Sequence, residues 1–189
     1  GKDYKVNPGD GAFYGPKLDF HVKDSLGRVW QCGTIQLDMN LPERFDITYV
    51  DDKGEKVRPV MLHRVIFGSI ERFIGILIEH FAGVFPLWLA PVQIKVLPVN
   101  NEYHLDYAKE VTELLQKNGF KVEMDAREEK LGYRIREGQM EKVPYLLVLG
   151  NNERDEKTVT YRKHGQQKQI TVPFDEFVTM LNQQIKNKE

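Results

Sequence analysis

The chain has 189 residues, 41% of them hydrophobic and 29% charged, and its formal net charge is −1. This length and composition predict one large or two small globular domains. The near balance of charge excludes a broad positive field, so any contact with RNA must come from a local patch. A single cysteine, Cys32, excludes an internal disulfide and favours a cytoplasmic location. Arg72, Glu79 and His80 interrupt the longest apolar run, so we expect no membrane partner.

Four strands are predicted in the first half of the chain, at residues 18–22, 28–38, 45–50 and 59–67. The first shows a strict alternation of apolar and polar side chains, and the last is an apolar run bounded by Pro59 and Gly68. Short turns separate the strands and favour an antiparallel meander. A sheet of this kind needs a helix or a second sheet on its apolar face.

A helix is expected to begin directly after the fourth strand. Gly68 ends the strand, and Ser69 is a suitable N-cap because its hydroxyl can accept from the first free amides. Apolar residues then recur at steps of three and four, which predicts a helix face turned to the core. The residues of this face are Ile70, Phe73, Ile74, Leu77, Ile78 and Phe81.

The second half of the chain has a different pattern. The segment 85–91 contains two prolines and suits a connector, so we divide the chain into domains of residues 1–90 and 91–189. Strands then alternate with helices, which predicts an α/β domain with a mixed sheet. The expected strands are 92–99, 120–124, 145–149, 158–162 and 169–172, and the expected helices are 104–117, 130–140 and 174–185.

Two side chains of the first half do not fit a plain core. His63 lies inside an apolar strand, where it is either a zinc ligand or a buried histidine with a backbone hydrogen bond, and the residues alone favour the second interpretation. Arg72 lies in the first helical turn, where the helix dipole disfavours a cation. Either an anion or an aromatic face holds it, or it pairs with Glu79 or Asp38, and the residues alone leave these alternatives open.

The strand, the Gly68-Ser69 break and the helix that opens with Glu71-Arg72 resemble motif 3 of the class II aminoacyl-tRNA synthetases. His63 stands nine residues before Arg72, which makes the stretch similar to the threonyl-tRNA synthetases in particular.

Three further segments resemble the threonyl-tRNA synthetases. They are Gly-Ala-Phe-Tyr-Gly-Pro-Lys at 11–17, Trp-Gln-Cys-Gly-Thr-Ile-Gln at 30–36 and Trp-Leu-Ala-Pro-Val-Gln at 88–93. The resemblance covers essentially the whole chain. Motifs 1 and 2, two of the three zinc ligands and the editing region of that family are absent from it, so the resemblance implies the C-terminal part of such an enzyme.

The resemblance implies a fold and an activity. The fold is the α+β C-terminal part of a class II antiparallel-sheet catalytic domain, followed by an α/β anticodon-binding domain with a mixed sheet. The activity is threonine-tRNA ligation, with ATP, Mg²⁺, Zn²⁺, threonine and tRNA(Thr) as cofactors and partners and with a homodimer in the intact enzyme. We expect this fragment to be inactive by itself.

Two alternatives stay open beside this interpretation. The first is a non-catalytic RNA-binding or regulatory protein that kept a synthetase-like fold. The second is another class II enzyme with the same C-terminal domain, such as a prolyl or glycyl enzyme. The residues Thr34, Gln36 and Arg72 argue against the first alternative, because a decayed site has no need of them, and His63 argues against both.

The resemblance also assigns site residues by position. Cys32 lies beside them in the sequence and is expected to be a small buried thiol. Four basic residues gather around the expected helix 130–140, where a solvated helix face is the default interpretation, and Glu128 stands where the family often has Asn. The basic residues are Arg127, Lys130, Arg134 and Arg136. The implied sets are Arg72, Gln36 and Lys17 for catalysis; Tyr14, Thr34, Gln36 and His63 for the amino acid, with His63 as one zinc ligand; Gln31, Thr34, Gly68, Ser69 and Arg72 for ATP; and Arg136, Glu153 and Arg162 for anticodon bases.

Overall fold

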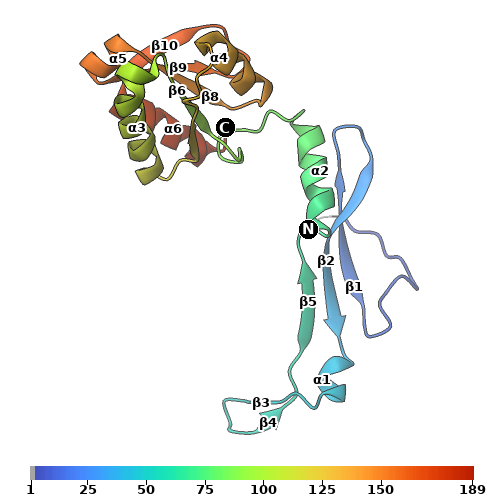
Figure 1. The fold of residues 1–189 in the computed structure, drawn as a ribbon. Helices are drawn as coiled ribbons and strands as arrows, with labels where there is room; N and C mark the ends of the chain where they lie inside the picture. Colours follow the sequence, from blue (N-terminus) through green and yellow to red (C-terminus); the bar gives the residue numbers. More distant parts are fainter. Residues whose placement is uncertain (1–2) are drawn as a thin grey trace. The chain divides into compact units, whose positions relative to one another are not determined.

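The computed structural model describes residues 3–189 and divides into two compact units, Gly1–His80 and Phe81–Glu189 (Figure 1). The domain boundary predicted after residue 90 stays a prediction, and the compact units divide after His80. None of the helices within residues 3–189 is long and apolar enough to cross a membrane.

The first unit is built on a three-stranded antiparallel sheet in the order β1-β2-β5. Its strands are β1 (Lys17–Lys23), β2 (Val29–Asp38) and β5 (Met61–Val65), and helix α2 (Ile70–His80) follows β5. In the register of the sheet, Lys17 lies opposite Gln36, and Gln36 lies opposite His63. The strands predicted at 18–22, 28–38 and 59–67 are therefore confirmed, and their pairing sets three site candidates side by side.

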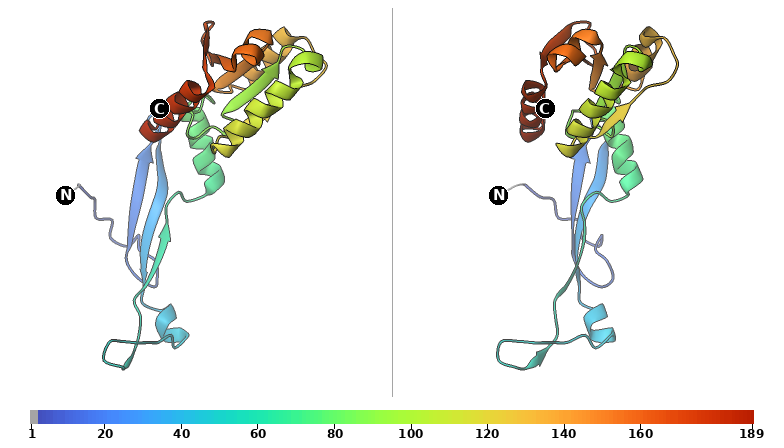
Figure 2. Two further views of the ribbon diagram at one scale, coloured as in Figure 1. Left: turned by 90° about the vertical axis from the view of Figure 1, so that its left-hand side faces the viewer. Right: turned by 60° about the vertical axis from the view of Figure 1, so that its left-hand side comes forward.

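The strand predicted at 45–50 is wrong. Residues Leu41–Arg44 form the short helix α1, and only Tyr49–Val50 (β3) is extended, paired with Lys56–Val57 (β4) in a separate hairpin (Figure 2). The cause lies at the end of β2, where the Asp38 carboxylate accepts the backbone amides of residues 40 and 41, each at 2.9 Å. These bonds turn the chain out of the sheet, so β2 pairs directly with β5 and the meander has three strands instead of four.

The apolar face predicted for α2 is not a buried face in this unit. Ile70, Ile74 and Ile78 are 64%, 48% and 47% exposed, and Ile76 is the buried residue of the helix. The periodicity is genuine, but a three-stranded sheet offers too little surface to cover it. Among the described residues of this unit the only buried apolar side chains are Cys32, Pro42 and Ile76.

The second unit contains a five-stranded mixed sheet in the order β10-β9-β8-β6-β7. Strand β6 is parallel to both of its neighbours, β7 and β8, whereas β8, β9 and β10 are antiparallel to one another in turn. The predicted mixed sheet and its closing hairpin are confirmed. The strands are β6 (Ile94–Pro98), β7 (Val122–Met124), β8 (Tyr145–Leu149), β9 (Thr158–Lys163) and β10 (Gln169–Pro173).

Alternating side chains of β6 and β8 separate the core of this unit into two clusters. The larger cluster packs α3 (Asn101–Lys117) and α6 (Phe174–Asn187) on one face of the sheet, and the smaller packs α4 (Leu131–Met140) on the other. The three predicted helices are confirmed. A fourth, α5 (Asn151–Glu156), was not predicted because it has no buried residue and therefore no apolar period.

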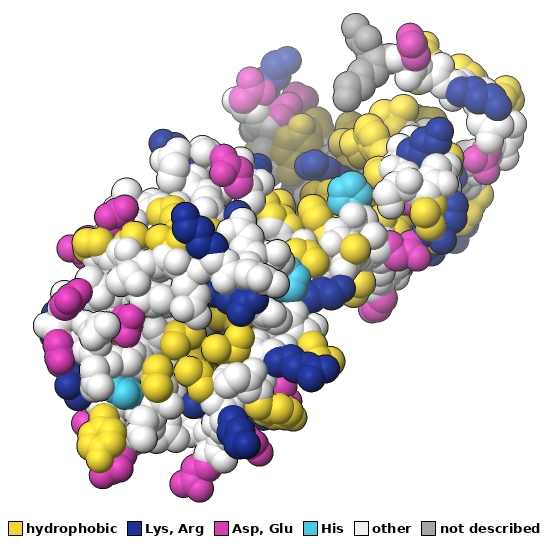
Figure 3. Space-filling model, turned by 90° about the horizontal axis from the view of Figure 1, so that it is seen from above, with side chains coloured by type: hydrophobic (Ala, Val, Ile, Leu, Met, Phe, Trp, Pro, Cys, Tyr) yellow, Lys and Arg dark blue, Asp and Glu magenta, His cyan; other side chains and the backbone are white. Residues whose placement is uncertain are grey.

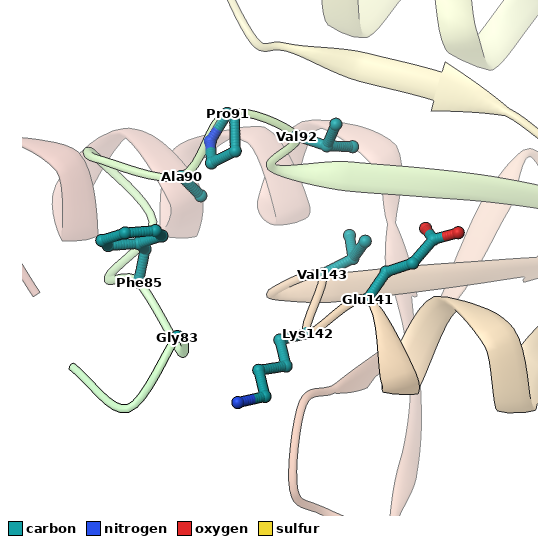
Figure 4. A pocket seen from close by; sticks show the side chains of 8 residues that line it. All are labelled: Gly83, Phe85, Ala90, Pro91, Val92, Glu141, Lys142 and Val143. Atoms are coloured by element: carbon teal, nitrogen blue, oxygen red, sulfur yellow. The ribbon is translucent and has the colours of Figure 1, made fainter. Parts of the chain in front are cut away.

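The segment 81–92 packs onto the second unit although it contains no helix or strand. Leu87 is 3% exposed and belongs to the large core cluster, and its carbonyl accepts the Gln93 side-chain amide at 2.8 Å. A cavity of about 160 Å³ lies between this segment and the loop after α4, and Figure 4 shows Lys142 on its loop side. Lys142 donates from Nζ to the Ala82 carbonyl. The proline-rich connector is therefore part of the second unit's packing.

Candidate active site and nucleic-acid interface

The first candidate site lies at the β2–β5 pair, where three segments of the chain meet. The Tyr14 hydroxyl donates to Gln36 Oε1 at 2.9 Å, and the rings of Tyr14 and His63 lie with centroids 5.9 Å apart. Since Gln36 and His63 are direct neighbours across the sheet, three of the four predicted amino-acid-binding side chains form one group. Thr34 lies two residues before Gln36 on the same strand and belongs to the neighbouring group described below.

Asp38 completes this group and was missed as a site residue by the sequence analysis. Its Oδ2 lies 2.7 Å from His63 Nε2, and its side chain is 1% exposed whereas that of His63 is 42% exposed. The hydrogen bond with His63, followed by those from the amides of residues 40 and 41, lowers the pKa of Asp38 against the effect of burial. An ionised carboxylate only accepts, so Nε2 donates and Nδ1 is left to other partners. The sequence did contain a signal for Asp38. It lies two residues after Gln36 on the same strand, so both side chains point to the same face of the sheet.

The described residues contain only part of a zinc site. No group of three or more His, Cys, Asp or Glu side chains within residues 3–189 is placed to hold a metal ion. His63 can supply one nitrogen, and its bond to Asp38 is the arrangement that orients a ligating histidine. Cys32 is a buried free thiol, as expected, and does not complete a ligand set.

A second group of polar side chains surrounds Asp19 on the adjoining strands. Asp19 Oδ1 accepts from Gln31 Nε2 at 2.8 Å and from Thr34 Oγ1 at 3.0 Å, and Oδ2 lies 3.0 Å from Lys17 Nζ. Partial burial would raise the pKa of Asp19, but the hydrogen bonds from Lys17 and Thr34 outweigh it and lower that pKa. Lys17, Gln31 and Thr34 were predicted as site residues, whereas the acid that joins them was not.

The Gly68-Ser69 break brings the start of α2 close to β2. Gly68 has φ +68°, and a Cβ there would lie 3.0 Å from the Cys32 carbonyl oxygen, so both the conformation and the space require glycine. The Ser69 hydroxyl donates to Glu71 at 2.7 Å and lies 3.4 Å from the Arg72 amide nitrogen. The backbone can therefore approach a ligand closely at this turn.

Arg72 is exposed and forms no ion pair with any residue that the structure describes. The two acids considered as its partners are taken: Glu79 pairs with Arg28, and Asp38 pairs with His63. The Glu71 carboxylate next to it accepts from Ser69 and forms no ion pair with Arg72, so this first-turn cation is available to an anionic or aromatic ligand.

The basic residues around α4 divide into engaged and available cations. Arg134 is 3% exposed and donates to the backbone carbonyls of Glu129, Asp125 and Pro98, so it holds the loop before α4 instead of facing solvent. Arg127 pairs with Asp125 and Glu137. These two residues therefore drop out of the predicted patch.

The three predicted anticodon-reading residues have different surroundings. Arg136 is exposed on α4 and has no ion pair with a described residue. The Glu153 carboxylate is engaged, because it accepts from the Gly150 amide at 2.8 Å and from the Thr160 hydroxyl at 2.5 Å. Arg162 Nε donates to the Gln166 carbonyl at 2.7 Å. The face seen in Figure 3 mixes basic and acidic side chains, in keeping with the balanced net charge.

Comparison with known domain families gives the class of the chain. Residues 3–81 match the tRNA synthetase class II core domain (G, H, P, S and T), and residues 93–184 match the anticodon binding domain. The antiparallel sheet that ends in the Gly-Ser turn and α2, followed by the mixed-sheet unit, agrees with both matches. Together the fold and the matches define part of a class II aminoacyl-tRNA synthetase.

Individual relatives narrow the class. A threonine-tRNA ligase of Acetivibrio thermocellus is 58% identical over 189 residues, which is 100% of this chain and 30% of that protein. A threonine-tRNA ligase of Fusobacterium nucleatum is 61% identical over 182 residues, which is 96% of this chain and 29% of that protein. The chain belongs to the threonyl-tRNA synthetase family and spans about 30% of the length of the curated relatives it matches.

A solved structure has the same fold. It is described as the RNA binding domain of threonyl-tRNA synthetase from Cryptosporidium parvum, with a TM-score of 0.84 and 41% sequence identity. The similarity covers 97% of this chain and 46% of that one.

Proposed function

We propose that the chain is part of an enzyme that activates threonine with ATP and transfers it to tRNA(Thr). The observation that carries this proposal is the group of Tyr14, Gln36 and His63, held together with Asp38, in a chain 58% identical to a threonine-tRNA ligase over its whole length. A site with a hydroxyl-reading partner rejects valine, which lacks the hydroxyl, far better than an apolar pocket does.

We assign His63 as one ligand of a Zn²⁺ ion whose other ligands lie outside the described residues. When bound, that ion would supply coordination to the amino group and hydroxyl of threonine. Asp38 orients the imidazole, and Tyr14 holds Gln36 beside it. Thr34 and Gln36 then face the amino acid from the neighbouring strand positions.

ATP, with its Mg²⁺, is assigned to the start of α2 and the Asp19 group. Arg72 contacts adenine or phosphate with its free guanidinium, and Gly68 and Ser69 allow the nucleotide to approach the backbone. Lys17 and Gln31 are held in place by Asp19 on the same sheet. The intact enzyme is proposed to be a cytoplasmic homodimer.

The second unit is proposed to read the anticodon of tRNA(Thr) through Arg136, Glu153 and Arg162. Protein side chains read RNA sequence best on unpaired bases, whose edges they can reach by hydrogen bonds. The remaining acceptor capacity of Glu153 and the free guanidinium of Arg136 suit this task.

We expect the isolated chain to show no threonine-dependent exchange of pyrophosphate into ATP. Its first unit has few buried apolar side chains and no complete metal-ligand group among the described residues. The full-length enzyme should exchange with threonine and not with valine, proline or glycine. Exchange by the isolated chain above background, or a preference of the full-length enzyme for proline or glycine, contradicts the proposal.

A further inference from the structure

The outer face of α4 carries a hollow that the assigned site residues leave unexplained. Tyr133, Arg136 and Met140 follow one another at helical steps of three and four, and Tyr133 and Met140 are 50% and 70% exposed. With Glu137 and Glu141 they line a cavity of about 490 Å³. This volume is in the range of pockets that hold small ligands.

The charges around this hollow leave one free cation. Glu137 pairs with Arg127, and Glu141 pairs with Lys95, whose side chain is 7% exposed. Both acids on the wall are thereby compensated from the protein side. Arg136 has no ion pair within the part of the chain that the structure describes. Arg136 is therefore the cation of this wall that is left for an anionic ligand, whereas both acids already have a basic partner.

The platform is rigid because α4 is anchored on its buried side. Arg134 Nη1 donates to the Asp125 carbonyl at 2.7 Å and Nη2 to the Pro98 carbonyl at 2.9 Å, which ties the helix to the ends of β7 and β6. Gly138 packs so closely that a Cβ there would lie 2.7 Å from Leu146 Cδ2. A fixed helix keeps the exposed side chains in place without a ligand.

We propose that this hollow receives one unpaired RNA base, with Tyr133 stacked on the base, Arg136 on the adjacent phosphate or base edge, and Met140 against the apolar side. The proposal rests on the proposed anticodon-binding function and names a further contact for it. An exposed aromatic ring next to a free guanidinium is the combination that holds unpaired bases, because stacking uses the face of any base while the cation takes the backbone charge.

The test is a cycle between protein and RNA variants, using the whole 189-residue chain. Wild type, Tyr133→Ala and Tyr133→Phe are titrated with the tRNA(Thr) anticodon stem-loop and with stem-loops that lack one anticodon-loop base at a time. Tyr103→Ala is the matched control, because Tyr103 is a 58% exposed tyrosine at the start of α3. Thermal unfolding of each variant checks that the fold is retained.

Tyr133→Ala should weaken binding about tenfold or more, whereas Tyr133→Phe and Tyr103→Ala should change it less than about twofold. With one particular abasic stem-loop the cost of Tyr133→Ala should vanish, since the base it stacks on is gone. Additive losses with every abasic stem-loop, or an equal loss from Tyr103→Ala, overturn the proposal. Suppose that wild type prefers the tRNA(Thr) stem-loop and that Tyr133→Ala binds this stem-loop as tightly as wild type does. Then this proposal fails and the anticodon-binding function stands. If wild type shows no preference, the proposed anticodon function fails with it.

Discussion

Replacing His63 by alanine in the full-length enzyme should remove bound zinc and abolish zinc-dependent recognition of threonine, with the fold retained. His63 is partly exposed, so its removal leaves no large cavity, and no group of three or more possible metal ligands within residues 3–189 could take its place. Asp38→Asn should act through the same imidazole and lower zinc affinity by about 10–100-fold, because a second partner fixes the orientation of a ligating histidine. Zinc content after dialysis and the KM for threonine and ATP measure both effects.

His21→Ala is the matched control for this experiment. His21 is exposed on β1 and lies opposite Gln31 in the sheet, so its loss should leave zinc content and threonine KM unchanged. The ATP KM should be similar in all three variants, because the ATP assignment involves other side chains. Unchanged bound zinc together with an unchanged threonine KM in His63→Ala would remove the basis for the zinc assignment.

Leu87→Ala should lower the free energy of unfolding of the second unit by about 2–5 kcal/mol. Leu87 is 3% exposed within the large core cluster, and truncating a buried leucine costs the lost transfer energy and leaves a cavity. A polypeptide of residues 92–189 should lose at least as much relative to 81–189, because it also loses the bond between Gln93 and the Leu87 carbonyl. Urea unfolding followed by circular dichroism measures these differences.

Val84→Ala is the control for the leucine, since Val84 belongs to the same segment and is 39% exposed. The urea concentration at the midpoint of unfolding should be nearly the same for Val84→Ala as for wild type. If 92–189 and 81–189 unfold at the same urea concentration, residues 81–91 add no stability to the second unit, and the segment 85–91 is a connector only.

Most strands and helices could be predicted from the sequence because their side-chain periods are set by local burial. The strand at 45–50 could not, because two hydrogen bonds of the Asp38 carboxylate redirect the chain before it. The apolar period of α2 was read correctly, but burial depends on the partners that cover a face. Within the described residues those partners are few, so Ile70 and Ile74 stay exposed.

The candidate site was predictable in its named residues but not in the acids that organise them. Tyr14, Gln36 and His63 stood out by resemblance, and sheet register brings them together. Asp38 and Asp19 look like ordinary strand-end and strand-surface acids in the sequence. Their roles arise from contacts across strands, to His63 in one case and to Gln31 and Thr34 in the other. In the second unit, burial decides between Arg134 and Arg136, which the sequence alone treats alike.

Specific reading of the anticodon is the most direct test of the account, and the 189-residue chain can be used as it is. The chain is titrated at fixed salt with the tRNA(Thr) anticodon stem-loop and with stem-loops whose anticodon bases are exchanged. We expect clear preference for the first, a loss of roughly tenfold or more for Arg136→Ala and Arg162→Ala, and a relaxed base preference for Glu153→Gln. Lys130→Ala, which changes a cation without an assigned role, should have little effect. Equal affinity for all stem-loops, with equal losses from Lys130→Ala and Arg136→Ala, would show a nonspecific basic surface and contradict the account.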